Sequence, residues 1–198
     1  KIEFEENGKT KTGWMWGGWS NGTNIIRFEF EKVDSVVDDI TIFTPLNTQS
    51  SVTSTDINNF IAHMIRNNPN NSVMLGMGEA YIKAARESNL NPIYLVSHSA
   101  LESNWGRSEI VKNKYNYYGI SAFDHCPSEC ASEYESKRSG IIEGAKWIST
   151  NYVERQIYQQ KTLDNMRNNK GIHQYATDEA WHVKIANIAQ SFLDFLRK

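Results

Sequence analysis

The sequence predicts a mainly α-helical domain with a small β-lobe, preceded by a short β-rich segment at the N-terminus. From residue 54 onward, apolar residues recur every three or four positions in several stretches, as they do on one face of a helix. Residues 113–136 interrupt this pattern with aromatic and acidic residues that are typical of a hairpin. Residues 1–50 instead combine glycine with alternating apolar and polar residues, which favours strands and turns.

Length and composition exclude several classes of function. The 198 residues suffice for one ordinary domain with a real core. A net charge of −2 argues against a nucleic-acid partner, which needs a strongly basic face. No run approaches the roughly 18 consecutive apolar residues of a spanning helix, so we expect no membrane insertion. We expect a monomer. The chain starts at Lys1, and we expect a fragment whose leader lies outside this sequence.

Residues 1–50 form the predicted N-terminal segment, whose role the sequence does not define. Residues 24–30 alternate apolar and charged side chains, and residues 40–44 are β-branched and end at Pro45, so we expect two or three strands. The segment also carries three closely spaced tryptophans, Trp14, Trp16 and Trp19. These either form a sugar-stacking platform or pack a small sheet against the main domain.

Polar residues 48–54 have the composition of a linker, so we place the main domain at residues 51–198. The first helix begins near Ser54 or Thr55, which suit an N-cap, and the second spans residues 78–89. The third begins at Pro92, a residue that fits the first turn of a helix. Three later helices are predicted. One begins near Ser139, a short one passes through Leu163 and Met166, and the last begins at Asp178, a suitable N-cap.

The third helix carries the first candidate for catalysis. It is apolar nearly all round, which predicts a central, buried position. Glu102 lies at its C-terminal end, just before breaks at Asn104 and Gly106. A carboxyl group where a buried helix opens into a loop is a candidate general acid, although many helices end in a glutamate without a function. One turn earlier, His98 fits a core histidine better than a metal ligand.

Two cysteines, Cys126 and Cys130, lie four residues apart beside His125. A zinc site usually needs four ligands, and no second cluster of cysteine and histidine is evident. The pair is therefore either a local disulfide or two free thiols. We expect no metal and no cofactor.

A helical domain with one acid and an aromatic, acidic hairpin suits the cleavage of polysaccharides. Sugars present flat apolar faces to aromatic rings, and a glycosidic bond needs a proton donor for its leaving oxygen. The sequence shows no Ser-His-Asp signature, phosphate-binding glycine loop or HExxH motif.

Three motifs support a family resemblance: Ser97-His-Ser-Ala-Leu-Glu-Ser-Asn-Trp-Gly-Arg-Ser108, Asn116-Tyr-Tyr-Gly-Ile120 and Gln174-Tyr-Ala-Thr-Asp178. In this order they resemble the glucosaminidase family of bacterial autolysins, glycoside hydrolase family 73. Residues 144–148 and 162–167 look closest to clostridial members. The resemblance covers residues 54–198 and implies a lysozyme-like fold. It also implies a secreted endo-β-N-acetylglucosaminidase that cuts the glycan strands of peptidoglycan in the cell wall.

The resemblance also implies roles for individual residues. Glu102 matches the family's proton-donating glutamate, and Tyr175 matches a tyrosine that is important for activity. Tyr118 and Gly119 match the motif at the start of the β-lobe. With these two, the residues expected to bind substrate are Asn116, Phe123, Tyr152 and Trp181, and a structural role for Tyr152 is equally compatible with its place on a core stripe.

The second catalytic group is left open by the sequence. The resemblance implies two routes. In the first, an acid of the β-lobe activates water and inverts the anomeric centre, and here Glu133 is the first candidate, Glu135 the second and Asp124 the third. In the other route the substrate's N-acetyl oxygen is the nucleophile, and Tyr175 positions it. Two rival functions also remain: an N-acetylmuramidase or lytic transglycosylase on the same fold, and a wall-binding module without catalysis.

Overall fold

The computed structural model describes residues 2–6, 9–13, 16–20, 23–27, 39–122 and 126–198. The chain divides into two compact units, Lys1–Asp34 and Ser35–Lys198, which we describe separately.

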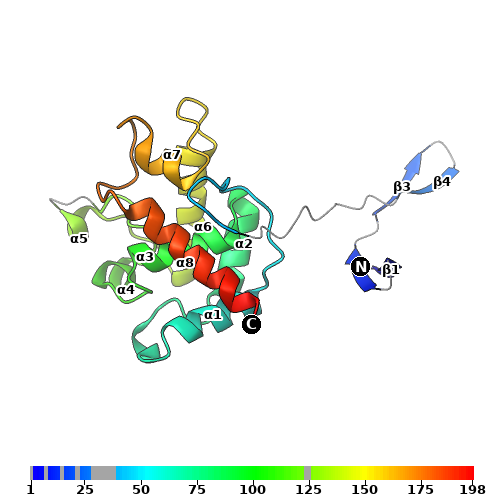
Figure 1. Cartoon of the computed structure of the whole chain (residues 1–198), viewed down its shortest axis with the longest axis horizontal. Helices are drawn as coiled ribbons and strands as arrows, with labels where there is room; N and C mark the ends of the chain where they lie inside the picture. The colour runs from blue at the N-terminus through cyan, green and yellow to red at the C-terminus, as the bar shows by residue number, and fades with distance from the viewer. Residues whose placement is uncertain (1, 7–8, 14–15, 21–22, 28–38, 123–125) are drawn as a thin grey trace. The chain divides into compact units, whose positions relative to one another are not determined.

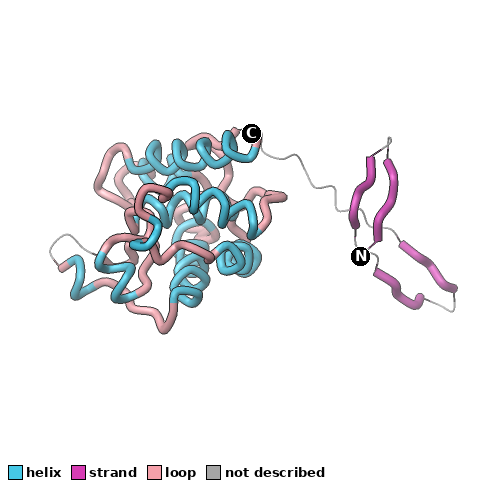
Figure 2. The backbone as a smooth tube through the Cα atoms, turned by 90° about the horizontal axis from the view of Figure 1, so that it is seen from below, coloured by secondary structure: helices cyan, strands magenta, loops and turns pink. Residues whose placement is uncertain are grey.

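The first unit contains two β-hairpins. Strand β1 (Ile2–Glu6) pairs antiparallel with β2 (Lys9–Gly13), and β3 (Trp16–Ser20) pairs antiparallel with β4 (Thr23–Arg27). Each pair is a two-stranded sheet of its own, drawn in magenta in Figure 2. The expected strand at 24–30 is described only as far as Arg27. The predicted tryptophan platform cannot be compared, since Trp14 and the side chains of Trp16 and Trp19 lie outside the described part of the chain.

The second unit is a bundle of helices (Figure 1). Its elements are α1 (Ser54–Met64), the 3₁₀ turn η1 (Pro69–Asn71), α2 (Gly78–Ser88), α3 (Pro92–Glu102), α4 (Glu109–Lys114), α5 (Pro127–Cys130), α6 (Lys137–Ile148), the π-helical turn η2 (Ser149–Val153), α7 (Leu163–Asn168) and α8 (Trp181–Leu196). Helix α3 is central, because every residue from Pro92 to Ala100 is buried. Helices α2 and α8 pack against it, which confirms the predicted position.

The helices begin where short polar side chains satisfy their first backbone N–H groups. The side chain of Thr53 accepts from the backbone of Asp56 at the start of α1, and the Asp56 carboxylate accepts from the Thr53 backbone in return. The Asn91 side chain accepts from two backbone N–H groups of α3, and Pro92 occupies the first turn. These contacts confirm the predicted starts of both helices to within about one residue.

The last helix begins later than the sequence indicated. Asp178 was the expected N-cap, but α8 starts at Trp181. The Asp178 carboxylate accepts from the backbone N–H of Ala180 at 2.9 Å and pairs with Lys184 at 2.6 Å. It therefore closes a turn that precedes the helix, and the observed N-cap is Ala180, two residues after the predicted one.

Residues 39–50 belong to the helical unit rather than to the N-terminal segment. Ile40 and Leu46 are buried in its core. The backbone of Leu46 donates to Lys161 at 2.9 Å and accepts from Asn91 at 2.7 Å. The expected strand at 40–44 is not formed, because the backbone turns between Thr41 and Thr44.

The expected hairpin is also absent from the described residues 113–122 and 132–136. Helix α4 occupies its start, and Tyr115, Gly119 and Ser121 have φ angles of 53°, 66° and 58°. Residues with positive φ turn the chain sharply and cannot continue a strand. The two segments still lie side by side, because Ser132 donates to Ile120 and Tyr134 to Lys114, both at 3.0 Å.

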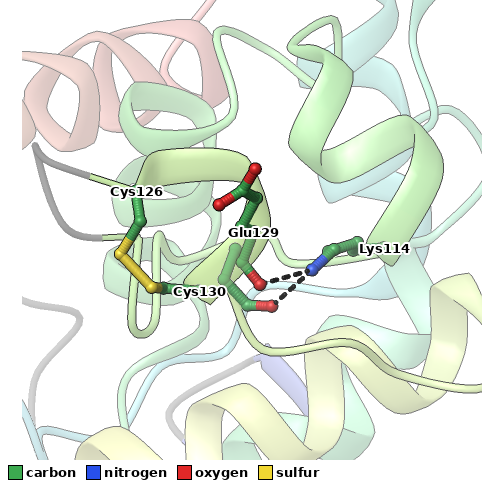
Figure 3. Close-up of a disulfide and its surroundings, with 5 residues drawn as sticks. Lys114, Cys126, Glu129 and Cys130 are labelled. Carbon is green, nitrogen blue, oxygen red and sulfur yellow. Dashed lines mark hydrogen bonds between the residues drawn. A yellow bond between two sulfur atoms is a disulfide. The ribbon is translucent and has the colours of Figure 1, made fainter.

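Cys126 and Cys130 form a disulfide across α5, which settles the alternative left open by the sequence (Figure 3). The ammonium group of Lys114 donates to the backbone carbonyls of Glu129 and Ala131, at 3.3 and 3.0 Å, and so ties this loop to α4. Among the described residues, no group of three or more His, Cys, Asp or Glu side chains could hold a metal ion. No helix in that part of the chain has the length and apolar character to cross a membrane.

Gly144 provides a test of how α6 packs against the ring of Tyr118. A Cβ atom at this position would lie 2.5 Å from a ring carbon of Tyr118, which is fully buried. A glycine-to-alanine change inside a helix normally stabilises it by about 1 kcal/mol. We expect Gly144→Ala to destabilise the domain by about 1–2 kcal/mol instead, because the buried ring must move. Chemical denaturation measures this, with the exposed neighbour Glu143→Ala as control. Unchanged or increased stability would contradict the packing.

Candidate active site

A cleft of about 780 Å³ opens at the C-terminal end of α3. Helix α3 contributes Leu101 and Glu102, and the loop after α4 contributes residues 119–122. The lining also includes the segment 173–178 together with Trp147, Tyr152 and Trp181. The lining thus combines apolar and aromatic surface with a central carboxyl group, the pattern expected of a site for a polar ligand with apolar faces.

The carboxyl group of Glu102 is held by one of its two oxygens. Its Oε1 accepts a hydrogen bond from the indole Nε1 of Trp181 at 2.6 Å. Its Oε2 faces Gly119, where a Cβ atom would lie only 2.8 Å away. Gly119 also has a φ of +66°, a backbone conformation that favours glycine, and a side chain here would displace the Glu102 carboxyl group. The Glu102 side chain is 22 % exposed, and it therefore reaches the cleft from a largely buried position.

His98 lies directly beneath Glu102 on the same face of α3. Its side chain is fully buried, and its Nδ1 lies 2.9 Å from the hydroxyl of Tyr94. Its Nε2 makes no hydrogen bond within the described part of the chain and lies 3.7 Å from Oε1 of Glu102. Four aromatic rings surround the imidazole at centroid distances of 4.7 to 5.4 Å, those of Tyr94, Tyr118, Tyr175 and Trp181.

Tyr175 joins the segment before α8 to the loop that follows α4. Its hydroxyl donates to the backbone carbonyl of Tyr118 at 2.7 Å, and its ring stacks on Trp181 at 5.0 Å. Burial raises the pKa of the Tyr175 phenol well above its usual range, and the negative charge of Glu102 raises it further. The phenol therefore stays protonated and acts as a hydrogen-bond donor.

An aromatic wall closes one side of the cleft. The imidazole of His173 stacks between Tyr152 and Tyr158, at centroid distances of 4.4 Å to each. Next to Tyr152, Trp147 is 36 % exposed and lines the cleft. Neither Trp147 nor His173 was among the site residues predicted from the sequence. Trp147 could have been found, because it is a large aromatic residue that falls off the core stripe of its helix.

Two residues expected to contact substrate lie beneath the cleft instead of in its lining. The buried Asn116 side chain accepts from the backbone N–H of Ile120 at 3.0 Å and donates to its carbonyl at 2.7 Å. Tyr118 is fully buried, with its ring against His98. Both residues shape the loop that carries Gly119.

The other residues predicted to bind substrate differ in where they lie. Gly119, Tyr152 and Trp181 line the cleft, although Trp181 is only 2 % exposed and its indole N–H is used by Glu102. Phe123 lies outside the described residues.

Two candidates for a second catalytic acid, Glu133 and Glu135, lie apart from this lining. Glu133 and Glu135 are exposed, and Glu135 borders a separate, smaller pocket. Asp124 lies outside the described residues. The second carboxyl group in the described lining is Asp178. The hydrogen bond from Lys184 and the backbone N–H of Ala180 lower the pKa of Asp178, so this carboxyl is an anion.

Residues 78–193 match the model of the glucosaminidase family, described as mannosyl-glycoprotein endo-beta-N-acetylglucosaminidase. The chain belongs to this family. The match confirms the resemblance that the three sequence motifs indicated, and it includes Glu102, Gly119 and Tyr175.

Curated relatives agree with this assignment. The chain is 39 % identical over 121 residues to a Streptococcus pneumoniae protein named as a candidate endo-beta-N-acetylglucosaminidase, covering 61 % of this chain and 18 % of the relative. It is 35 % identical to a beta-N-acetylglucosaminidase of Bacillus subtilis, covering 63 % and 16 %. It is 36 % identical to a bifunctional autolysin of Staphylococcus epidermidis, covering 62 % and 11 %. The chain thus spans less than a fifth of the length of these relatives.

Solved structures show the same fold. Autolysin E of Staphylococcus aureus superposes with a TM-score of 0.67 at 25 % identity, covering 94 % of this chain and 87 % of that one. Glucosaminidase B of the same organism gives 0.56 at 26 % identity, covering 83 % and 67 %. A catalytic mutant of autolysin E, 24 % identical with a TM-score of 0.67 and the same coverage, was solved with the disaccharide NAG-NAM. The helical, lysozyme-like body that the resemblance implied is therefore confirmed.

The bond between Tyr175 and Tyr118 can be tested by removing one hydroxyl. Tyr175→Phe leaves the Tyr118 carbonyl without its donor, which costs about 1–3 kcal/mol for a buried group. We expect a lower midpoint of thermal unfolding for Tyr175→Phe, because the segment before α8 is then no longer bonded to the loop after α4. Tyr158→Phe is the control, because the Tyr158 hydroxyl makes no hydrogen bond to any described residue. Equal behaviour of the two variants would show that this bond does not shape the site.

Proposed function

We propose that this domain is an endo-β-N-acetylglucosaminidase that hydrolyses the glycan strands of bacterial peptidoglycan. The observation that carries the proposal is the placement of Glu102, with one oxygen held by Trp181 and the other facing the cleft beside Gly119. Membership of the glucosaminidase family supports the reaction type. The NAG-NAM disaccharide in a related autolysin supports the substrate class.

Glu102 acts as the general acid in this proposal. Its Oε2 passes a proton to the glycosidic oxygen while the bond from that oxygen to the anomeric carbon breaks, and the leaving sugar keeps the electron pair. The carboxylate that results carries its charge partly on Oε1. The N–H group of Trp181 already points at this atom, so the charge is stabilised without any rearrangement.

The aromatic wall supplies the affinity for sugars. Trp147 presents part of its ring to the cleft, and Tyr152 lies next to it at a centroid distance of 5.8 Å. Apolar sugar faces stack on such rings and leave the hydroxyl groups to polar neighbours. Residues 119–122 also line the cleft, and we propose that the segment 115–136 takes the part of the family's β-lobe.

Two routes complete the hydrolysis, and they need different residues. In the first, a second carboxylate activates water across the cleft and inverts the anomeric centre, and Glu133 is our first candidate, before Glu135. In the second, the N-acetyl oxygen of the substrate attacks the anomeric carbon, with Tyr175 as a positioning residue. The first route is supported by the exposed position of Glu133, which leaves its carboxyl group accessible to substrate. The second route is supported by Tyr175, which lines the cleft.

We also propose that the domain acts outside the cell, at the cell wall, as a monomer. The Cys126–Cys130 disulfide supports this location, because such bonds persist in oxidising compartments. The autolysin names of its relatives agree with it.

Analysis of the ends produced from purified peptidoglycan tests the function. We expect new reducing N-acetylglucosamine ends from the wild-type domain. We expect the activity of Glu102→Gln to be at least about 100-fold lower, because the amide has no transferable proton. The thermal stability of this variant should change little. New muramic or anhydromuramic ends would instead indicate a muramidase or lytic transglycosylase. Wall binding without any release of ends would indicate a binding module.

A pair of matched variants separates the two routes. If Glu133 activates water, Glu133→Gln should lose about 100-fold in rate, while Glu135→Gln, two residues along the same exposed segment, should stay near the wild-type rate. NMR of the first product formed should then show inversion at the anomeric carbon. Near-normal rates for both variants, together with retention, would favour the substrate-assisted route.

A further inference from the structure

His98 is the one fully buried histidine among the described residues, and the reaction proposed above does not use it. It lies between Tyr94 on one side and Glu102 on the other, with all three residues on α3. One nitrogen has a partner, because Nδ1 is 2.9 Å from the Tyr94 hydroxyl. The other, Nε2, is buried, has no hydrogen-bond partner and lies 3.7 Å from Oε1 of Glu102. A buried polar atom without a partner costs free energy, so its position beside the acid needs an explanation.

The surroundings of His98 determine which nitrogen carries a proton. If the neutral ring carried its proton on Nδ1 alone, the lone pair of Nε2 would face the oxygen of Glu102, and the two would repel each other. The neutral ring with its proton on Nε2, and the charged ring, both direct an N–H group at Glu102. The arrangement beside a carboxylate therefore favours a proton on Nε2.

Tyr94 supports the same assignment. Burial raises the pKa of the Tyr94 phenol well above its usual range, with a further contribution from the negative charge of Glu102, so the hydroxyl keeps its proton. It can donate that proton either to Nδ1 of His98 or to the sulfur of Met166 at 3.6 Å. An imidazole nitrogen is the stronger acceptor, since thioether sulfur accepts only weakly. Donation from Tyr94 to Nδ1 leaves the proton of a neutral His98 on Nε2.

We infer that His98 is a positioning residue for the acid, which directs its Nε2–H group at Oε1 of Glu102 and is itself oriented by Tyr94. This inference rests on the proposed function of Glu102. When Oε2 gives its proton to the leaving oxygen, the negative charge that remains on the carboxylate is shared with Oε1. Two fixed donors, Trp181 at 2.6 Å and His98 at 3.7 Å, then face that atom. The proton is thereby confined to Oε2, the oxygen beside Gly119, since Oε1 faces two N–H groups.

The ring contacts explain how a neutral donor can be held so firmly. The rings of Tyr118, Tyr175 and Trp181 meet the imidazole edge-to-face, at interplanar angles of 65°, 70° and 86°. Such contacts restrain the rotation of the side chain. The imidazole is thus fixed before substrate arrives, which is what stabilisation of a developing charge requires.

Two substitutions of similar length separate positioning from packing. In His98→Gln the side-chain amide can place an N–H group near the position of Nε2, whereas His98→Met fills the space without a donor. We expect His98→Met to lower kcat on purified peptidoglycan by about 10-fold or more, with KM within about twofold of the wild-type value. We expect His98→Gln to recover most of that loss. Thermal unfolding of both variants measures their stability independently.

The outcomes are distinct. If both variants lose activity equally, or neither loses any while both are folded, His98 is a packing residue and the inference is overturned. Long-range ¹H–¹⁵N NMR of the wild-type domain gives a test that needs no variant, and we expect the proton on Nε2. A proton on Nδ1 alone would overturn the inference. If the wild type fails to cleave peptidoglycan, the proposed function fails, but the NMR result still reports the state of His98.

Discussion

The hydrogen bond from Trp181 to Glu102 is the contact on which the site depends. It joins the first residue of α8 to the last residue of α3, 79 positions apart in the chain. The indole is nearly fully buried, so the bond is shielded from water, and an N–H donor to a carboxylate is among the stronger hydrogen bonds in proteins. Because α8 also packs along α3, the orientation of the acid is set by the packing of two helices and not by a loop. A shift of either helix would move the acid relative to the cleft.

The aromatic residues around this bond connect the remaining parts of the cleft. Tyr175 stacks on Trp181 and holds the carbonyl of Tyr118, and Tyr118 precedes the glycine that faces the acid. Gly144 allows α6 to approach the Tyr118 ring closely. The acid, the loop beside it and one wall of the cleft are therefore held by a single cluster. A change at any member is expected to alter stability and geometry together.

The local parts of this structure could be predicted from the sequence, whereas the long-range parts could not. Thr53, Asn91 and Pro92 act on backbone groups within three residues, so the starts of α1 and α3 followed from local patterns. The strand expected at 40–44 did not form, because the backbone turns between Thr41 and Thr44. None formed in the described residues 113–122 either, because Tyr115 and Ser121 adopt positive φ angles that their side chains do not signal. Glu102 was predicted to be the acid from its motif. Its bond to Trp181 depends on how distant helices pack, which periodicity does not reveal.

The two carboxyl groups in the described lining differ in a way that supports the assignment of the acid. Asp178 is 45 % exposed, is paired with Lys184 and accepts from a backbone N–H, so three features of its surroundings keep it ionised. A permanent anion of this kind has no proton to give. Glu102 is less exposed and uses only Oε1 for its hydrogen bond, while Oε2 meets the cleft beside a glycine. Of these two carboxyl groups, only Glu102 has an oxygen that is free to meet a ligand in the cleft, which supports the proposal that Glu102 is the proton donor.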